Sequence, residues 1–200
     1  MYSEAEYKKL VSKYGNCASW AIWDFLKESN TSVISNNYVQ LHSKFVLLAM
    51  NPSDILVPEP WVNFRGGKHD RKLKYACNDT KLRGSYITDL FKDIAEANSN
   101  NIKGHLNNET IETNVRLFNQ EMTDIKISKD TKFIVLGVPN SFLAQCFNLH
   151  FKQQYKNETI YYCHYSYYKL TDKAWVTGFW KKLGIDQDFE STIKKYSKAL

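Results

Sequence analysis

Two short runs of almost uninterrupted apolar residues constrain the fold more than any other feature of this chain. After an initial lysine, residues 44–50 read FVLLAM and residues 132–138 read FIVLGV. A strand with one wet face alternates polar and apolar residues, whereas a strand covered on both faces can be apolar throughout. Two further strand candidates lie at 84–88 and 159–164. Strands separated by helical segments predict a mainly parallel sheet with helices on both faces.

The helical segments are indicated by caps and by apolar spacing. Ser3 and Glu6 form a capping box, which predicts a helix from there to about residue 14. The apolar and Trp-rich segment 18–27 fits a helix and a strand equally well. Apolar spacing predicts further helices over residues 68–76, 89–97, 109–122, 142–151, 171–183 and 188–199.

Length and composition favour one globular domain over residues 1–200. The chain has 200 residues, 43% hydrophobic and 14% aromatic, which is enough for a core without disulfides or metals. Its formal net charge of +6 permits an anionic partner such as DNA or a nucleotide, and it is equally typical of basic proteins without one.

Other classes of protein find no support in the sequence. The first residues carry no secretory signal, and no apolar run approaches the ~20 residues of a membrane span. The four cysteines are far apart and form no Cys-x-x-Cys pair, so we expect reduced thiols in a cytoplasmic protein and no metal site. No cofactor motif and no obligate protein partner is indicated.

Polar groups follow each of the four predicted strands. In a parallel sheet the carboxyl ends of the strands meet at one edge, where ligands bind. One polar exit is a turn, and Asn51 to Asp54 alone fits a plain Asx turn. Four exits at one edge indicate a site. The four are Asn51-Pro52-Ser53-Asp54, Thr88-Asp89, Pro139-Asn140-Ser141 and His164-Tyr165-Ser166.

These exits resemble the motifs of the uracil-DNA glycosylase superfamily. An apolar strand ending in Asn51-Pro52-Ser53 and a late strand ending in His164-Tyr165-Ser166 are similar to the two motifs of that superfamily. The resemblance covers residues 44–170 at the motifs only, and the segment 63–93 looks like a bacterial branch. It implies a three-layer α/β/α sandwich whose mainly parallel four-stranded sheet has the order 2-1-3-4.

The resemblance also implies roles for individual residues. Asn51, with Asp54, would orient the attacking water, and His164 would stabilise the leaving base as a hydrogen-bond donor. Phe64 would stack on the base, and Asp89 would contact its edge. Tyr168 or Leu170 would fill the gap left by a base that has moved out of the duplex. Further substrate contacts are expected from Pro52, Ser53, Asn140 and Ser166.

Two readings of function follow. The resemblance implies hydrolysis of an N-glycosidic bond to a base in DNA or a nucleotide. Tyr165 stands where the superfamily has Pro, and Asp89 stands where the uracil-specific enzymes have Asn. An ionised carboxylate accepts hydrogen bonds and cannot donate to a carbonyl, so these differences also fit a protein that binds a nucleobase, a nucleotide or DNA without catalysis. Trp61 and Phe64 also fit a purely structural role, as a cover for the sheet edge.

Overall fold

The fold is an α/β arrangement around one mixed sheet. The computed structural model describes residues 1–24, 26–27, 29–53, 59–67, 69–97 and 101–197. The strands are β1 (Ala18–Trp20), β2 (His42–Ala49), β3 (Ser85–Asp89), β4 (Lys132–Val135) and β5 (Thr159–Tyr161). The helices are α1 (Glu4–Tyr14), α2 (Ser32–Ser35), α3 (Arg71–Cys77), α4 (Asn108–Asp124), α5 (Phe142–Cys146), α6 (Asp172–Leu183) and α7 (Phe189–Ser197).

The sheet has the order β1-β3-β2-β4-β5. β2 pairs with β3 and β4 in parallel, and β4 pairs with β5 in parallel. β1 pairs antiparallel with β3 and forms one edge. The prediction of a four-stranded sheet with the order 2-1-3-4 is therefore wrong, because the sheet has a fifth strand, β1, beside β3. Segment 18–27, ambiguous in sequence, contributes the fifth strand, because Trp20 is buried between Tyr86, Trp61 and Tyr2.

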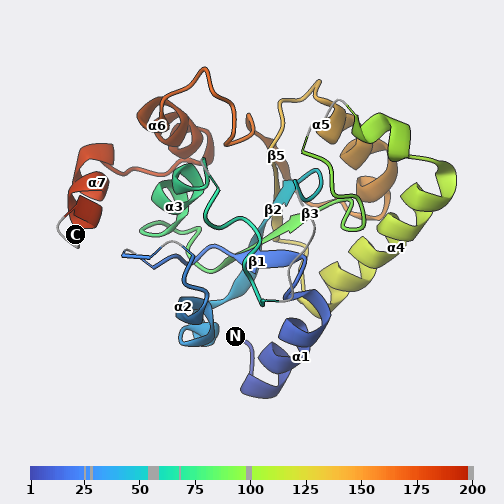
Figure 1. Cartoon of the computed structure of the whole chain (residues 1–200), viewed down its shortest axis with the longest axis horizontal. Coiled ribbons are helices and arrows are strands. Elements are labelled where there is room, and N and C mark those ends of the chain that lie inside the picture. The colour runs from blue at the N-terminus through green and yellow to red at the C-terminus, as the bar shows by residue number, and fades with distance from the viewer. Residues whose placement is uncertain (25, 28, 54–58, 68, 98–100, 198–200) are drawn as a thin grey trace.

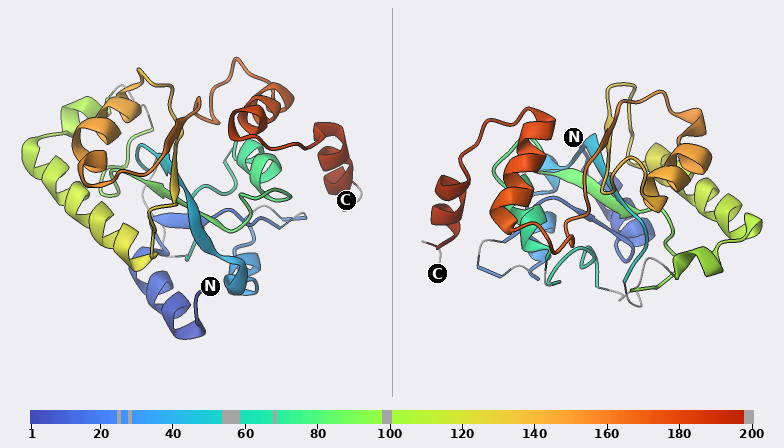
Figure 2. Two further views of the ribbon diagram at one scale, coloured as in Figure 1. Left: turned by 180° about the vertical axis from the view of Figure 1, so that it is seen from behind. Right: turned by 90° about the horizontal axis from the view of Figure 1, so that it is seen from above.

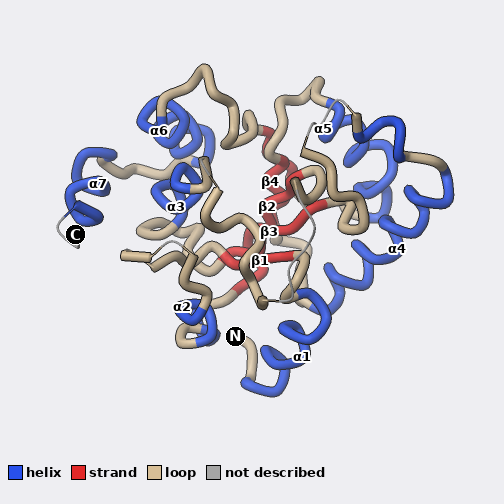
Figure 3. The backbone as a smooth tube through the Cα atoms, in the orientation of Figure 1, coloured by secondary structure: helices blue, strands red, loops and turns tan. Residues whose placement is uncertain are grey.

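Helices cover both faces of the sheet and make three layers. Alternate residues of β2 point to opposite faces: Val46 and Leu48 join one apolar cluster, and Leu47 joins the other. The first cluster includes side chains of α1, α4 and α5, and the second includes side chains of α3, α6 and α7. The two groups of helices lie on opposite sides of the central strands (Figures 1 and 3), and the view from above shows the same layering (Figure 2).

Several local predictions are confirmed and one is wrong. The capping box is present, since Ser3 Oγ accepts from Glu6 N and Glu6 accepts from Ser3 N. The helix predicted over 142–151 begins as α5 and continues as a π-helical turn, Phe147–Phe151. Among the described residues of the segment 89–97 there is no helix. Backbone N–H groups at Leu90 and Phe91 donate instead to Ala49 O and Met50 O, so the chain follows β2 past the end of the sheet.

Candidate functional site

The carboxyl ends of the parallel strands lie at one edge of the sheet and carry the predicted polar residues. Ala49 pairs with Asp89 at the ends of β2 and β3, and Asn51 follows two residues later. His164 follows β5 on the same edge. β3 and β5 are three strand spacings apart, or about 14 Å at ~4.8 Å each. Asn51, Asp89 and His164 therefore end or follow strands at the same carboxyl edge of the sheet.

The side chain of Asn51 ties two loops together. Asn51 Nδ2 donates to Pro52 O at 2.8 Å, Ile94 O at 3.1 Å and Glu96 O at 2.8 Å. The backbone N–H of Glu96 donates back to Pro52 O at 3.0 Å. An amide nitrogen has two hydrogens, so these carbonyls engage it fully and only Oδ1 is left to accept from a ligand or a water.

Asp89 is a buried carboxyl with a raised pKa. It is 1% exposed, and Asn63 Nδ2 donates to its Oδ2 at 3.1 Å. Its Oδ1 is buried without a hydrogen-bond partner in the described part of the chain. Burial raises the pKa of Asp89 to about 7, against the opposing effects of Asn63 and Lys92 and with the help of Glu121. Near neutral pH, Asp89 is thus partly protonated, and a protonated carboxyl both donates and accepts.

His164 is held as a neutral imidazole of defined tautomer. Ser166 N donates to His164 Nδ1 at 3.2 Å, and Ser166 Oγ lies 2.7 Å from the same atom. Because Nδ1 accepts from a backbone amide, the proton of the neutral ring is on Nε2, which is left to donate. Burial, with smaller contributions from the charges of His69 and Lys72, lowers the pKa of His164 to about 4. The side chain therefore donates from Nε2 without carrying a charge.

The ring of Tyr165 packs against the ring of His164. Its ring centroid is 4.2 Å from that of His164, with 32° between the planes. Burial raises the pKa of Tyr165 well above its ordinary value, and the charges of Asp70 and Asp89 raise it further. The phenol is therefore protonated near neutral pH and is a direct neighbour of the imidazole.

Phe64 and Trp61 belong to the core. Phe64 is 7% exposed and packs in the cluster that joins the sheet to α3 and α6, so the expected ring face for a ligand is not presented. Trp61 is 0% exposed and donates from Nε1 to Tyr7 Oη. Both residues have positive φ, 66° at Trp61 and 64° at Phe64, in the left-handed region that side chains rarely adopt. The strained turn that they form covers the edge of the sheet.

The remaining predicted residues are spread along the edge. Pro52 is buried, whereas Ser53, Asn140 and Ser166 are exposed. Tyr168 is 77% exposed, and its ring is tilted by 49° against that of Tyr167, with centroids 6.1 Å apart. Leu170, the alternative to Tyr168, is half-buried. Asp54 lies outside the described residues.

Sequence reasoning missed the buried polar residues that support the site. Lys92 Nζ lies 2.8 Å from Glu121 Oε2 and donates to Asp89 O at 2.6 Å. Lys72, in α3, is 1% exposed. A lysine on the apolar face of a predicted helix was the available signal for Lys72. Glu121 gave none, because its partners Tyr86 and Thr88 are distant in the sequence.

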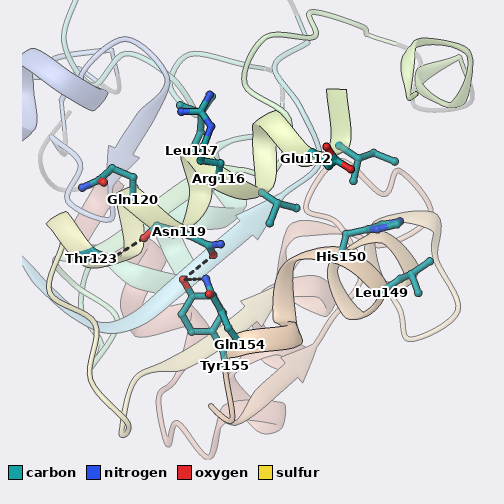
Figure 4. Close-up of a pocket in the computed structure, with 12 residues that line it drawn as sticks. Glu112, Arg116, Leu117, Asn119, Gln120, Thr123, Leu149, His150, Gln154 and Tyr155 are labelled. Carbon is teal, nitrogen blue, oxygen red and sulfur yellow. Dashed lines mark hydrogen bonds between the residues drawn. The ribbon is translucent and has the colours of Figure 1, made fainter. Parts of the chain in front are cut away.

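A separate groove lies between α4 and the π-helical turn Phe147–Phe151, on the face of the sheet away from α3 and α6 (Figure 4). Its volume is about 1010 Å³, and Val115, Leu149 and His150 are among its lining residues. Tyr155 Oη donates to Asn119 Oδ1 at 2.9 Å across its wall. None of the residues predicted from the sequence lines this groove.

Within the described ranges, no group of three or more His, Cys, Asp or Glu side chains is placed to hold a metal ion. The same ranges contain no helix that combines the length and apolar character needed to cross a bilayer. Comparison of the chain with protein-family models, curated proteins and solved structures gave no match.

Proposed function

We propose that this protein is a uracil-DNA-glycosylase-like base-binding protein that hydrolyses an N-glycosidic bond in DNA or a nucleotide. The observation that carries the proposal is the arrangement of Asn51, Asp89 and His164 at one carboxyl edge of a sheet with parallel neighbours. The motif resemblance supports it independently of the structure.

The chemistry of the three residues suits this reaction. Cleavage of the bond between sugar and base leaves negative charge on the base, and a preplaced donor stabilises that charge. His164 offers Nε2–H from a ring whose Nδ1 is already engaged by Ser166. Asn51 Oδ1 is free of the loop contacts made by its nitrogen and can orient a water as an acceptor.

Asp89 suits a base with both donor and acceptor groups at its edge. With a pKa of about 7, its carboxyl exists in both protonation states near neutral pH. In the protonated state it offers one donor and one acceptor, as an asparagine does. The presence of Asp in place of Asn is therefore compatible with recognition of a base carbonyl.

A base in a duplex must leave the stack before it can reach such a site. The test is to incubate the full chain with single-stranded and duplex oligonucleotides containing uracil, hypoxanthine or xanthine, followed by alkaline cleavage at abasic sites. We expect cleavage with at least one base, its loss in His164→Gln and its retention in His150→Gln, a matched histidine in the separate groove. No cleavage with any base at stoichiometric protein would contradict hydrolysis.

A second candidate is binding without catalysis, favoured by a specific contact. The ring of Tyr165 packs on that of His164 with 4.2 Å between the centroids, so a base that stacks on the imidazole must displace this ring. If this candidate is correct, we expect the protein to bind a fluorescent oligonucleotide or nucleotide without releasing a base. We also expect Tyr165→Ala to bind the same probe more tightly. Release of a base in the same samples would eliminate this candidate.

A further inference from the structure

Side chains from two helices donate hydrogen bonds to the turn that carries His164, one on each side of the histidine. Trp175 Nε1, in α6, donates to Cys163 O at 3.0 Å just before the histidine. Lys72 Nζ, in α3, donates to Tyr167 O at 3.1 Å and to Leu170 O at 3.0 Å just after it. Two helices that are distant in the sequence thus hold the two sides of one short turn.

The hydrogen bonds from Lys72 to this turn are unusual, because their donor is a buried ammonium group. Lysine is almost never fully buried unless it is paired, yet Lys72 is 1% exposed. Within the described ranges, no Asp or Glu lies at ion-pair distance from its ammonium, whose contacts are the two carbonyls. A glutamine has two N–H donors and could bond to two carbonyls without burying a charge. The two hydrogen bonds alone therefore do not explain why this residue is a positively charged lysine.

The charge acts on the residues of the turn. Among the described residues, His69 and Lys72 are the groups whose charges lower the pKa of His164, and both precede or begin α3. Lys72 also opposes the rise that burial causes in the pKa of Cys163. Its ammonium donates to Tyr167 O, and the backbone N–H of Tyr167 donates to His164 O at 3.0 Å, so the charge lies at the turn that carries the imidazole. Within the described residues, no carboxylate lies at ion-pair distance from it.

We infer that Lys72 is a positioning residue for His164, which fixes the turn carrying the imidazole and places a positive charge beside it. The catalytic part of this inference rests on the proposed function, because charge on a leaving base would be stabilised by a field from Lys72 acting through His164. The structural part stands without any substrate. No covalent step involves Lys72.

The test follows His164 by NMR in the full chain, with the ring nitrogens labelled. In Lys72→Gln, we expect the pKa of His164 to rise above about 4, because a like charge is removed while a donor is kept. Burial, the largest cause of the low pKa, remains and should keep it below the ordinary 6.5. In Lys72→Arg the charge remains, and the pKa should stay near the parent value. Lys81→Gln is the matched control, since Lys81 donates to Leu183 O at 2.7 Å but does not act on His164.

An unchanged pKa of His164 in folded Lys72→Gln would overturn the inference. If Lys72→Gln does not fold, Lys72→Arg provides the test. Faster amide hydrogen exchange at Tyr167 and Leu170, with His164 still neutral, would support the inference. A His164 that titrates at its ordinary pKa in this variant would overturn it. Activity is read separately. If a base is released, we expect kcat/KM to fall about tenfold in Lys72→Gln and to stay near the parent value in Lys81→Gln. If no base is released but the pKa rises, the proposed function fails and the positioning role remains.

Discussion

Lys92 and Glu121 form an ion pair inside the protein, with Nζ and Oε2 2.8 Å apart and the glutamate side chain 0% exposed. The other carboxylate oxygen, Oε1, accepts from Tyr86 Oη at 2.7 Å and from Thr88 Oγ1 at 3.0 Å. The ammonium also donates to Asp89 O. This network joins α4 to the end of β3 and thereby fixes the backbone that carries Asp89.

Removal of one partner from this pair should be strongly destabilising. Lys92→Ala leaves a buried carboxylate without its cation, which typically costs about 3–5 kcal/mol of the free energy of unfolding. The exposed pair of Lys8 and Glu4, with 2.7 Å between Nζ and Oε1, is the control, and Lys8→Ala should cost far less, because water screens that pair. Urea unfolding at pH 7 measures both. Equal losses in the two variants would mean that the buried network contributes little.

Asp89 should make the protein less stable as the pH rises. Its pKa is about 7 in the folded protein and 3.8 ordinarily, so the unfolded chain releases this proton first. Between about pH 4 and 7 the folded state holds more protons, and the contribution of Asp89 to stability falls by an amount on the order of 3–4 kcal/mol. Asp89→Asn should remove this slope and be more stable than the parent at pH 8. Denaturant unfolding at pH 5 and pH 8 compares them.

His164 should act in the opposite direction. Its pKa is about 4 in the folded protein and 6.5 ordinarily, so the unfolded chain binds the proton first as the pH falls. The contribution of His164 to stability is therefore present above about pH 6.5 and is lost toward pH 4. His164→Gln should flatten the stability curve in this window only. The nitrogen chemical shifts of the parent should also show Nδ1 unprotonated at pH 7, and a protonated Nδ1 would contradict the assigned tautomer.

Asn51 should matter for the fold as well as for any reaction. A carboxylate cannot donate to the carbonyls of Pro52, Ile94 and Glu96, so Asn51→Asp should destabilise the protein by about 1–3 kcal/mol. Ser53→Ala changes an exposed side chain nearby and should have little effect on stability. Thermal unfolding measures both. Loss of activity in Asn51→Asp is therefore informative about catalysis only at a temperature where the variant is folded.

The parallel strands and most long helices were predictable because their signals are local. Apolar runs mark β2 and β4, and the capping box marks the start of α1. The failures have physical causes. Residues 89–97 have helical spacing, yet their backbone bonds to β2 and to Asn51 override that preference. Ala18–Trp20, at the start of the ambiguous segment 18–27, forms a strand because of aromatic contacts from distant residues, which no local window contains.

The position of the candidate residues along the sheet was predictable from the sequence, but how deeply each side chain is buried was not. Strand exits locate Asn51, Asp89 and His164 at one edge, since the geometry of parallel sheets does so for any sequence. Burial depends on what the rest of the chain places above these residues. Phe64 enters the core through a backbone with positive φ, and a lysine on α3 bonds to a turn that follows it by almost half of the chain.

The antiparallel edge strand has a consequence for the order of folding. Ala18 is synthesised long before its ladder partner Thr88, and closing so long a loop costs entropy before the pairing is gained. On a translating ribosome, Trp20 therefore stays without its partner Tyr86 until β3 has left the exit tunnel. During this interval the emerging chain displays an aromatic segment that suits recognition by chaperones, and the first strand made must wait for the third before it can join the sheet.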